Sequence, residues 1–333
     1  KHAEEALRQS DELFRMLIDS VPGISIQGYD TDGIVRYWNK ANELVYGYTA
    51  GEAMGRNLGD LVVPADLRPL FDQCLVVGKT LTRSGEFMPS GELILKHKNG
   101  SPVPVFSIHT AVCAESREPL MFCLDVDLSE RKRIEADLRQ RAERAQHLQA
   151  VLLDLAKGSF PDTPSAVRRI LEIAANELDV GRTSLWWYNP ADMTLVCEEV
   201  CSRNGDDTRD RGMILDMHGH RDYRLLIEKN RVVPIDTVSD NPIIDGPIRE
   251  YLQERGITSF LLVPVWLHGE FIGVLNHEHT GAPRTWPAEE QQFAASVADI
   301  ISLAREGAER RTAEEALRAS EKRYREIFDT IPV

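Results

Sequence analysis

The chain has 333 residues, of which 42% are hydrophobic and 28% are charged, and its formal net charge at pH 7 is -14. A chain of this length exceeds one hydrophobic core and predicts two domains of ordinary size. The acidic balance argues against nucleic acid or an anionic membrane as the main partner, because both attract basic surfaces. No apolar run approaches the roughly 20 residues that span a membrane, so no membrane contact is expected in this fragment.

Residues 1–22 predict an N-terminal signalling helix that leads into the first domain. Its apolar residues follow a helical spacing and stop at a proline-glycine pair: Phe14, Leu17, Ile18, Val21, Pro22 and Gly23. Part of this pattern returns near the end of the chain, where Ala313-Glu314-Glu315-Ala316-Leu317-Arg318 repeats Ala3-Glu4-Glu5-Ala6-Leu7-Arg8. We therefore expect residues 304–333 to form a linker helix and the start of a second copy of the first domain, with an effector beyond Val333.

The first domain is predicted at residues 23–127. Two strands come first, three helical pieces follow and three strands close the domain: Ile24–Gln27, Ile34–Trp38, Asn42–Tyr46, Ala50–Met54, Leu67–Val77, Glu92–Lys96, Val103–Ala111 and Leu120–Asp125. Asp30–Gly33 and Lys98–Ser101 have the composition of tight hairpin turns. This order implies an antiparallel sheet with helices packed on one face.

Three motifs in this segment resemble the PAS family of sensor domains. They are Trp38-Asn39-x-Ala41-x-Glu43, Gly47-Tyr48-Thr49-x-x-Glu52-x-x-Gly55-Arg56-Asn57 and Asp127-Leu128-Ser129-Glu130-Arg131-Lys132. The last run is similar to the family signature Asp-Ile-Thr-Glu-Arg-Lys, which ties the last strand to the exit helix. The resemblance therefore implies that Asp127, Ser129 and Arg131 transfer the signal. Capping of the helix by Ser129 is an alternative role for the same residues.

The PAS resemblance also implies a pocket between the long helix and the sheet. Its predicted lining is Ile26, Trp38, Leu67, Leu70, Phe71, Cys74, Phe106, Ile108 and Phe122. Covalent flavin of the LOV type is not expected, because Leu58 follows Gly55-Arg56-Asn57 where those relatives carry a cysteine. Haem is not expected, since the helix at 65–77 contains no histidine. A small apolar metabolite or non-covalent flavin stays open, and so does a packed core with no room for a ligand.

Residues 128–155 contain no glycine or proline and predict one continuous helix. Its apolar positions alternate at spacings of four and three, as in a coiled coil: Ile134, Leu138, Ala145, Leu148, Leu152 and Leu155. Arg131 and Arg141 interrupt this seam. The stripe is too narrow for burial within a domain, so we expect a homodimer through parallel helices.

The second domain is predicted at residues 156–303. Its helices are expected at Ser165–Glu177, Tyr223–Lys229, Pro247–Arg255 and Ala288–Arg305, and its strands at Thr183–Tyr188, Leu195–Val200, Val232–Ile235, Ser259–Leu267 and Glu270–His277. The runs Ile257–Val265, Gly269–Leu275, Glu278–Gly281 and Trp286–Ala294 resemble the GAF family. The whole chain is thus predicted to be α+β, with two sheet domains, PAS-like and GAF-like, joined by a long helix.

The GAF resemblance implies a pocket lined by Trp186, Leu225, Ile235, Tyr251, Phe260, Leu262 and His277. Covalent bilin is excluded at the helix beginning at Pro247, because no cysteine follows Ser202. The cyclic-nucleotide pattern is met only loosely, by Asn276-His277 and Glu289-Glu290. The pairs His218/His220 and His277/His279 each lie on one strand face. A metal site would need these segments to converge, which the sequence does not show. Such histidines are more often exposed or hydrogen-bonded, so no metal site is expected.

No catalytic motif occurs in the chain, so we expect no enzyme activity in this fragment. The five cysteines, Cys74, Cys113, Cys123, Cys197 and Cys201, form no CxxC pair and favour a reduced, cytoplasmic setting. The expected function is a sensory input module of a bacterial signal-transduction protein, which passes ligand or redox state through paired helices to a histidine kinase of a two-component system. An input module of a diguanylate cyclase or phosphodiesterase and a ligand-free dimerisation scaffold are the alternatives. No covalent cofactor is expected.

Overall fold

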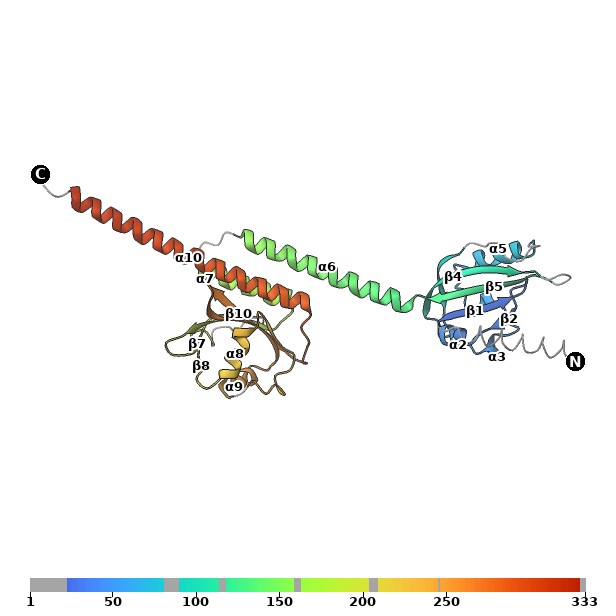
Figure 1. Cartoon of the computed structure of the whole chain (residues 1–333), viewed down its shortest axis with the longest axis horizontal. Helices are drawn as coiled ribbons and strands as arrows, with labels where there is room; N and C mark the ends of the chain where they lie inside the picture. The colour runs from blue at the N-terminus through green and yellow to red at the C-terminus, as the bar shows by residue number, and fades with distance from the viewer. Residues whose placement is uncertain are drawn as a thin grey trace. The chain divides into compact units, whose positions relative to one another are not determined.

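The structure is a computed structural model, and it describes residues 23–80, 90–113, 118–158, 163–203, 209–244 and 246–329. The helix predicted at 1–22 lies outside these residues. The chain divides into two compact units, Lys1–Arg139 and Gln140–Val333, and each is described by itself. Each unit holds an antiparallel sheet flanked by helices (Figure 1), which confirms the predicted α+β class.

The first unit is built on a five-stranded sheet. Its strands in chain order are β1 (Ile24–Tyr29), β2 (Val35–Trp38), β3 (Gly91–Lys96), β4 (Pro102–Val112) and β5 (Leu120–Asp127). In space the order is β2-β1-β5-β4-β3, so the first and last strands pair at its centre. The turn after β1 is the predicted hairpin: Asp30 Oδ1 accepts the Ile34 N–H at 2.9 Å, and Gly33 has a φ of 81°.

In the described part of the chain, four short helices lie between β2 and β3. They are α2 (Lys40–Tyr46), α3 (Ala50–Ala53), α4 (Leu58–Leu61) and α5 (Arg68–Gly78). Side chains that accept backbone N–H groups begin three of them: Asn39 caps α2, Thr49 forms a capping box with Glu52 at α3, and Asn57 caps α4. The sequence did not predict α4, because four residues are too few to show a helical period.

The helices of the first unit cover one face of its sheet. The buried core there consists of strand residues and helix residues packed together: Tyr29, Val35, Val105, Met121 and Cys123 with Tyr46, Ala53, Leu61, Val62 and Phe71. The opposite face carries Phe106 and Ile108, whose side chains are 40% and 42% exposed. Successive residues of a strand point to opposite faces, so Val105 and Ser107 are buried where Phe106 and Ile108 are not.

Helix α6 (Ser129–Lys157) follows β5 after one residue, close to the predicted range. Leu128, at this junction, is buried, and its backbone N–H donates to the Pro104 carbonyl of β4 at 2.9 Å. Lys132 Nζ in the first turn of α6 pairs with Glu92 Oε2 of β3 at 2.7 Å. The start of α6 is therefore attached to the sheet of the first unit by backbone and side chain alike.

The second unit is built on a six-stranded antiparallel sheet. Its strands are β6 (Arg182–Asn189), β7 (Thr194–Ser202), β8 (Ile214–Asp216), β9 (Val233–Ile235), β10 (Ile257–Leu267) and β11 (Glu270–Thr280). They lie in the order β8-β7-β6-β11-β10-β9. The hairpin between β10 and β11 turns at His268 and Gly269, which both have positive φ. The three residues of β8 were not predicted.

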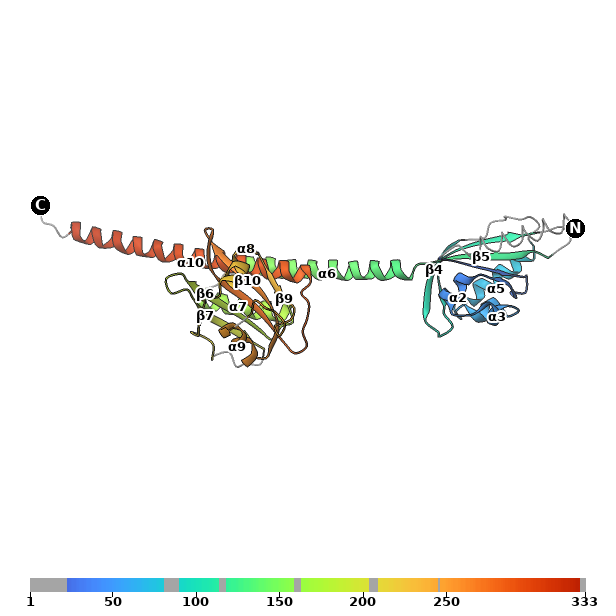
Figure 2. The same cartoon turned by 60° about the horizontal axis from the view of Figure 1, so that its bottom comes forward.

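Helices cover both faces of the second sheet, so this unit has two buried cores. α7 (Thr163–Glu177) and α10 (Ala288–Asp329) lie on one side, and α8 (Arg221–Lys229) and α9 (Gly246–Glu254) on the other (Figure 1). The first core also contains Leu148 and Leu155 from α6. The second view shows α10 continuing well past the sheet (Figure 2). The predicted closing helix and the predicted linker helix are thus one helix.

One glycine of the second sheet marks a close approach between two strands. Gly273 of β11 pairs with Trp187 of β6, and a Cβ at residue 273 would lie 2.2 Å from the Trp186 carbonyl oxygen. Only glycine fits there without movement of β6. Among the described residues, no helix combines the length and the apolar character that crossing a membrane requires.

Candidate functional site

The main candidate site is a cavity of about 190 Å³ in the first unit, between α5 and the sheet. Aromatic and aliphatic side chains make up most of its lining: Tyr29, Leu58, Val62, Val63, Leu67, Leu70, Phe71, Leu93 and Leu95. Tyr29 and Phe71 lie with their ring centroids 5.7 Å apart. An apolar cavity of roughly 150 Å³ in another protein binds benzene, so this one has room for a small molecule.

One end of the cavity is polar and centres on the buried carboxylate of Asp125. Gln27 Nε2 and Tyr46 Oη donate to Asp125 Oδ2, and Ser107 Oγ donates to Oδ1, each at 2.5 Å. His109 Nε2 lies 3.1 Å from Ser107 Oγ. Because the one hydroxyl proton of Ser107 goes to the carboxylate, His109 Nε2–H must be the donor to Ser107. Three side-chain hydrogen bonds thus satisfy the buried carboxylate of Asp125.

The two cysteines of the cavity lining are not reactive thiols. Burial raises the pKa of Cys123 well above its usual value, and it also raises the pKa of Cys74. Cys123 Sγ donates to Tyr29 Oη at 3.7 Å, and burial raises the pKa of that phenol as well. Thiols protonated at neutral pH are poor nucleophiles, so the cavity is suited to binding a ligand without a covalent bond.

The structure corrects part of the predicted lining. Leu67, Leu70, Phe71 and Cys74 of the α5 segment do line the cavity. The other five predicted residues lie outside the lining: Ile26, Trp38, Phe106, Ile108 and Phe122. Trp38 is buried in the core beside Tyr46, while Phe106 and Ile108 face away from the helices. On three strands the inward residues lie one position away from the predicted ones, namely Gln27, Ser107 and Cys123, and Asp125 follows Cys123 on the same face of β5.

The predicted signal-transfer residues lie at the junction of β5 and α6. Asp127 Oδ1 accepts the Ser129 N–H at 2.7 Å, so the carboxylate of Asp127 takes the capping role that the sequence left to Ser129. Arg131 Nε pairs with Glu135 Oε1 at 2.7 Å within α6. Asp125 of the cavity lies two residues before Asp127 on the same strand. The end of β5 therefore connects the cavity to the start of α6.

The predicted dimer seam divides into two halves. Ile134 and Leu138 are 52% and 60% exposed, and Ala145 is exposed as well. Leu148 and Leu155 are instead buried in the core that α7 and α10 share, with Leu152 partly buried against it. The expectation that these three leucines pair with a second chain is thus corrected, because their own chain covers them.

The predicted ligand pocket of the second unit is nearly filled. Trp186, Tyr251 and Phe260 line a cavity of about 20 Å³, which holds roughly one water molecule. Ile235 and Leu262 belong to the core around it, and Leu225 is half-buried on α8. The prediction that His277 lines this pocket is wrong. Its neighbours Asn276 and Glu278 face the cavity, so the side chain of His277 lies on the other face of β11. Burial lowers the pKa of His277 to about 3.

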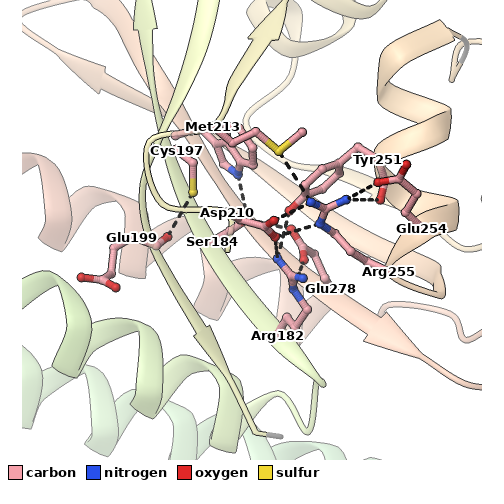
Figure 3. Close-up of polar contacts among 11 residues, drawn as sticks. Arg182, Ser184, Cys197, Glu199, Asp210, Met213, Tyr251, Glu254, Arg255 and Glu278 are labelled. Atoms are coloured by element: carbon pink, nitrogen blue, oxygen red, sulfur yellow. Dashed lines mark hydrogen bonds and ion pairs between the residues drawn. The ribbon is translucent and has the colours of Figure 1, made fainter. Parts of the chain in front are cut away.

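A buried ion-pair network closes this pocket on the side of β6 (Figure 3). Glu278 Oε1 accepts from Ser184 Oγ at 2.6 Å, and Glu278 Oε2 lies 2.9 Å from Arg182 Nε. Arg182 Nη2 also donates to Asp210 at 2.7 Å and to the Tyr251 hydroxyl at 3.0 Å. Arg255 Nε donates to the same Asp210 carboxylate at 2.8 Å. Asp210 thus fastens the segment before β8 to β6 and to the end of α9.

The two histidine pairs do not converge on a metal site. His218 Nδ1 lies 2.6 Å from Asp216 Oδ1 before α8, whereas His277 is fully buried in β11. In the part of the chain that the structure describes, no three His, Cys, Asp or Glu side chains are placed to hold a metal ion.

Comparison with known families places both units. A family model described as PAS domain matches residues 22–130, and a model described as GAF domain matches residues 162–304. No curated protein matches the chain.

Solved structures with related folds are distant in sequence. The photosensory core module of the Stigmatella aurantiaca phytochrome is 14% identical with a TM-score of 0.42, over 90% of this chain and 60% of that chain. A GAF domain from a phosphoenolpyruvate-protein phosphotransferase of Coxiella burnetii is 17% identical with a TM-score of 0.44, over 51% of this chain and 98% of that chain. The chain thus spans 60% of the phytochrome module that it matches.

Proposed function

Because the chain is a PAS domain followed by a GAF domain, and so a sensory input module, we propose that its PAS cavity binds a small molecule and that α6 carries the signal onward. The observation that supports this is the placement of the cavity beside Asp125 on β5, the strand that leads into α6. A ligand that moves Asp125 changes the strand end at Asp127 and Leu128, where α6 begins. The PAS domain is therefore the sensing element in this proposal.

The GAF domain has a different role in the proposal. The cavity between its sheet and the helices α8 and α9, at about 20 Å³, is too small for a ligand, and the network around Asp210 holds the surrounding segments together. We therefore assign it a structural role, in which it holds the end of α6 through Leu148 and Leu155. This observation favours scaffolding for the GAF domain alone.

The output side of the proposal is a homodimer that regulates a separate effector. Ile134 and Leu138 remain exposed on the first half of α6 and offer a short seam for the same helix of a second chain. We propose a histidine kinase of a two-component system as the effector, with no catalysis in this span. Five free cysteines are in keeping with a reducing, cytoplasmic setting.

Native mass spectrometry of the freshly purified chain tests the sensing step. We expect added mass on the wild-type chain and bare mass on Cys74→Phe, whose ring would occupy the cavity from α5. Val76→Phe places the same ring on the exposed side of α5 and should keep the added mass. If Cys74→Phe fails to fold, Leu67→Phe fills the cavity from the start of α5.

Two results would overturn the sensing step. One is a wild-type chain of bare mass that no added small molecule stabilises against heat. The other is a folded Cys74→Phe chain that keeps the added mass. For the relay, hydrogen exchange at Leu120–Glu135 should differ between loaded and empty chains, and identical exchange there would contradict a signal through α6.

A further inference from the structure

One hydrogen-bond acceptor in the PAS cavity has no partner. Gln27 lines the cavity with a side chain that is 1% exposed, and its Oε1 makes no hydrogen bond within the described residues. The orientation of the amide is fixed, because Asp125 can only accept and so must face the Nε2 side of Gln27. The free oxygen is therefore a property of the network, and a buried acceptor without a partner is unfavourable.

The donors around Gln27 are already engaged. Gln27 Nε2, Tyr46 Oη and Ser107 Oγ all donate to Asp125, and His109 Nε2 donates to Ser107. None of these four hydrogen bonds is made to Gln27 Oε1, which stays without a partner among the described residues. A molecule in the cavity that carries a donor of its own would supply that partner.

Size and charge restrict the molecule further. At about 190 Å³ the cavity exceeds the roughly 150 Å³ that accommodate benzene elsewhere, which allows one substituted ring or a small bicyclic system. The rings of Tyr29 and Phe71 offer aromatic faces and edges to such a ring. Asp125 repels an anion. A cation would pair with the Asp125 carboxylate, so Gln27 Oε1 discriminates among uncharged molecules.

We infer that the PAS cavity selects a neutral, one- or two-ring aromatic molecule with a single N–H or O–H donor, which Gln27 Oε1 accepts. This inference rests on the proposed sensing role of the same cavity. It adds a chemical class of ligand and names the residue that discriminates within that class.

Matched pairs of molecules test this selection on the intact chain by calorimetry. Indole and 4-methylphenol carry a donor, whereas indene and p-xylene have nearly the same shape without one. We expect at least one donor-bearing molecule to bind roughly tenfold or more tightly than its partner, since the partner leaves Gln27 Oε1 unsatisfied. Gln27→Met should remove this preference.

A control variant separates the acceptor from the rest of the network. Ser107→Ala also takes one donor from Asp125 but leaves Gln27 Oε1 in place, so its preference for the donor-bearing molecule should persist. If Gln27→Met does not fold, Gln27→Leu gives the same test. A preference that survives both Gln27 variants would overturn the assignment of Gln27.

The remaining outcomes distinguish this inference from the proposed function. Equal affinity within each pair would overturn the inference and indicate that water satisfies Gln27, while the sensing role would stand if Cys74→Phe abolished binding of both molecules. No binding of any of the four molecules also overturns the inference, and the mass of the purified chain then decides the sensing role on its own.

Discussion

The guanidinium of Arg255 lies 4.0 Å from the centroid of the Tyr251 ring while it donates to the carboxylate of Asp210. Arg182 reaches the same carboxylate from β6 and the hydroxyl of the same tyrosine. One acidic side chain, only 7% exposed, therefore balances two arginines that are themselves largely buried. Loss of this carboxylate would leave two positive charges without their shared partner.

We predict that Asp210→Asn lowers the free energy of unfolding of the GAF domain by about 3 kcal/mol at pH 7, because Arg182 and Arg255 lose the carboxylate that they share and Arg182 keeps only its pair with Glu278. Thermal and urea unfolding followed by tryptophan fluorescence would measure the loss. Asp240→Asn removes an exposed carboxylate of the same domain and should change stability little. Equal effects of the two substitutions would contradict the role given to Asp210.

The same variant gives a pH dependence with a definite sign. Hydrogen bonds from Arg255 lower the pKa of Asp210 from 3.8 to about 2. A carboxylate with a lowered pKa stabilises the fold above its unfolded pKa, and this contribution is lost as pH falls toward the folded pKa. The difference in stability between the wild type and Asp210→Asn should therefore shrink by about 1 kcal/mol between pH 5 and pH 3. A difference that is constant over this range would refute the argument.

Two leucines of α6 test which half of the helix belongs to the GAF core. We predict that Leu155→Ala destabilises the GAF domain by roughly 2–5 kcal/mol, since Leu155 is buried against α7 and α10. Leu153→Ala is the matched control on the same helix, with a side chain that is 54% exposed, and should cost below about 0.5 kcal/mol. Chemical unfolding at low protein concentration measures both. Similar losses would mean that Leu155 is not in the core of its own chain.

Dimerisation through the exposed half of α6 gives a prediction of its own. The double variant Ile134→Glu and Leu138→Glu places charge on the exposed seam and should weaken the dimer at least roughly tenfold. The control, Ala136→Glu with Gln140→Glu, adds the same charge about 200° around the helix. Light scattering coupled to size exclusion would compare the masses. A wild-type monomer at all concentrations would contradict the paired helices.

The close approach at Gly273 predicts a substitution that acts through the backbone. Gly273→Ala places a methyl group 2.2 Å from the Trp186 carbonyl and should destabilise the GAF domain by roughly 1–3 kcal/mol. Gly307→Ala, within α10, meets only a flexible arginine side chain and should stabilise by up to about 1 kcal/mol. Thermal unfolding of both variants would show opposite shifts in Tm. Shifts of the same sign would contradict the crowded geometry at Gly273.

Much of the fold was predictable from the sequence, because long segments with a clear period form the same elements in the structure. The strands predicted at Val103–Ala111 and Ser259–Leu267 appear as β4 and β10, with ends that differ by two residues or fewer. The predicted PAS and GAF families are confirmed by the matching family models. The elements that were missed, α4 and β8, have four and three residues, which is too short for either period.

The cavity was less predictable because hydrophobicity pointed to the wrong face of the sheet. In β4, Phe106 and Ile108 are more apolar than Ser107 and His109, although the latter two face the cavity. Polar residues of the cavity thus occupy positions where a core rule expects apolar ones. One feature of the sequence could have indicated the cavity. Gln27, Ser107 and Asp125 are polar residues within predicted strands that are otherwise largely apolar.

Other misses have a different cause, because a period does not reveal the partner. The apolar spacing along α6 is the same for Leu138 and Leu155, yet only Leu155 is covered by its own chain. Nothing in the sequence indicated that Asp210 would accept hydrogen bonds from Arg182 and Arg255, which lie 28 and 45 residues away. Such contacts depend on how the strands and loops come together in three dimensions.

The division of α6 into an exposed first half and a buried second half matters for the construction of chimeric sensors. A junction placed between Ile134 and Gln140 would exchange the PAS domain and keep every leucine that the GAF core needs. A junction at Leu152 would instead keep Leu155 but replace Leu148 with a residue of the foreign helix. That residue would not be adapted to the GAF core. The usable splice region of this helix is therefore short, and it lies in the first half of the helix.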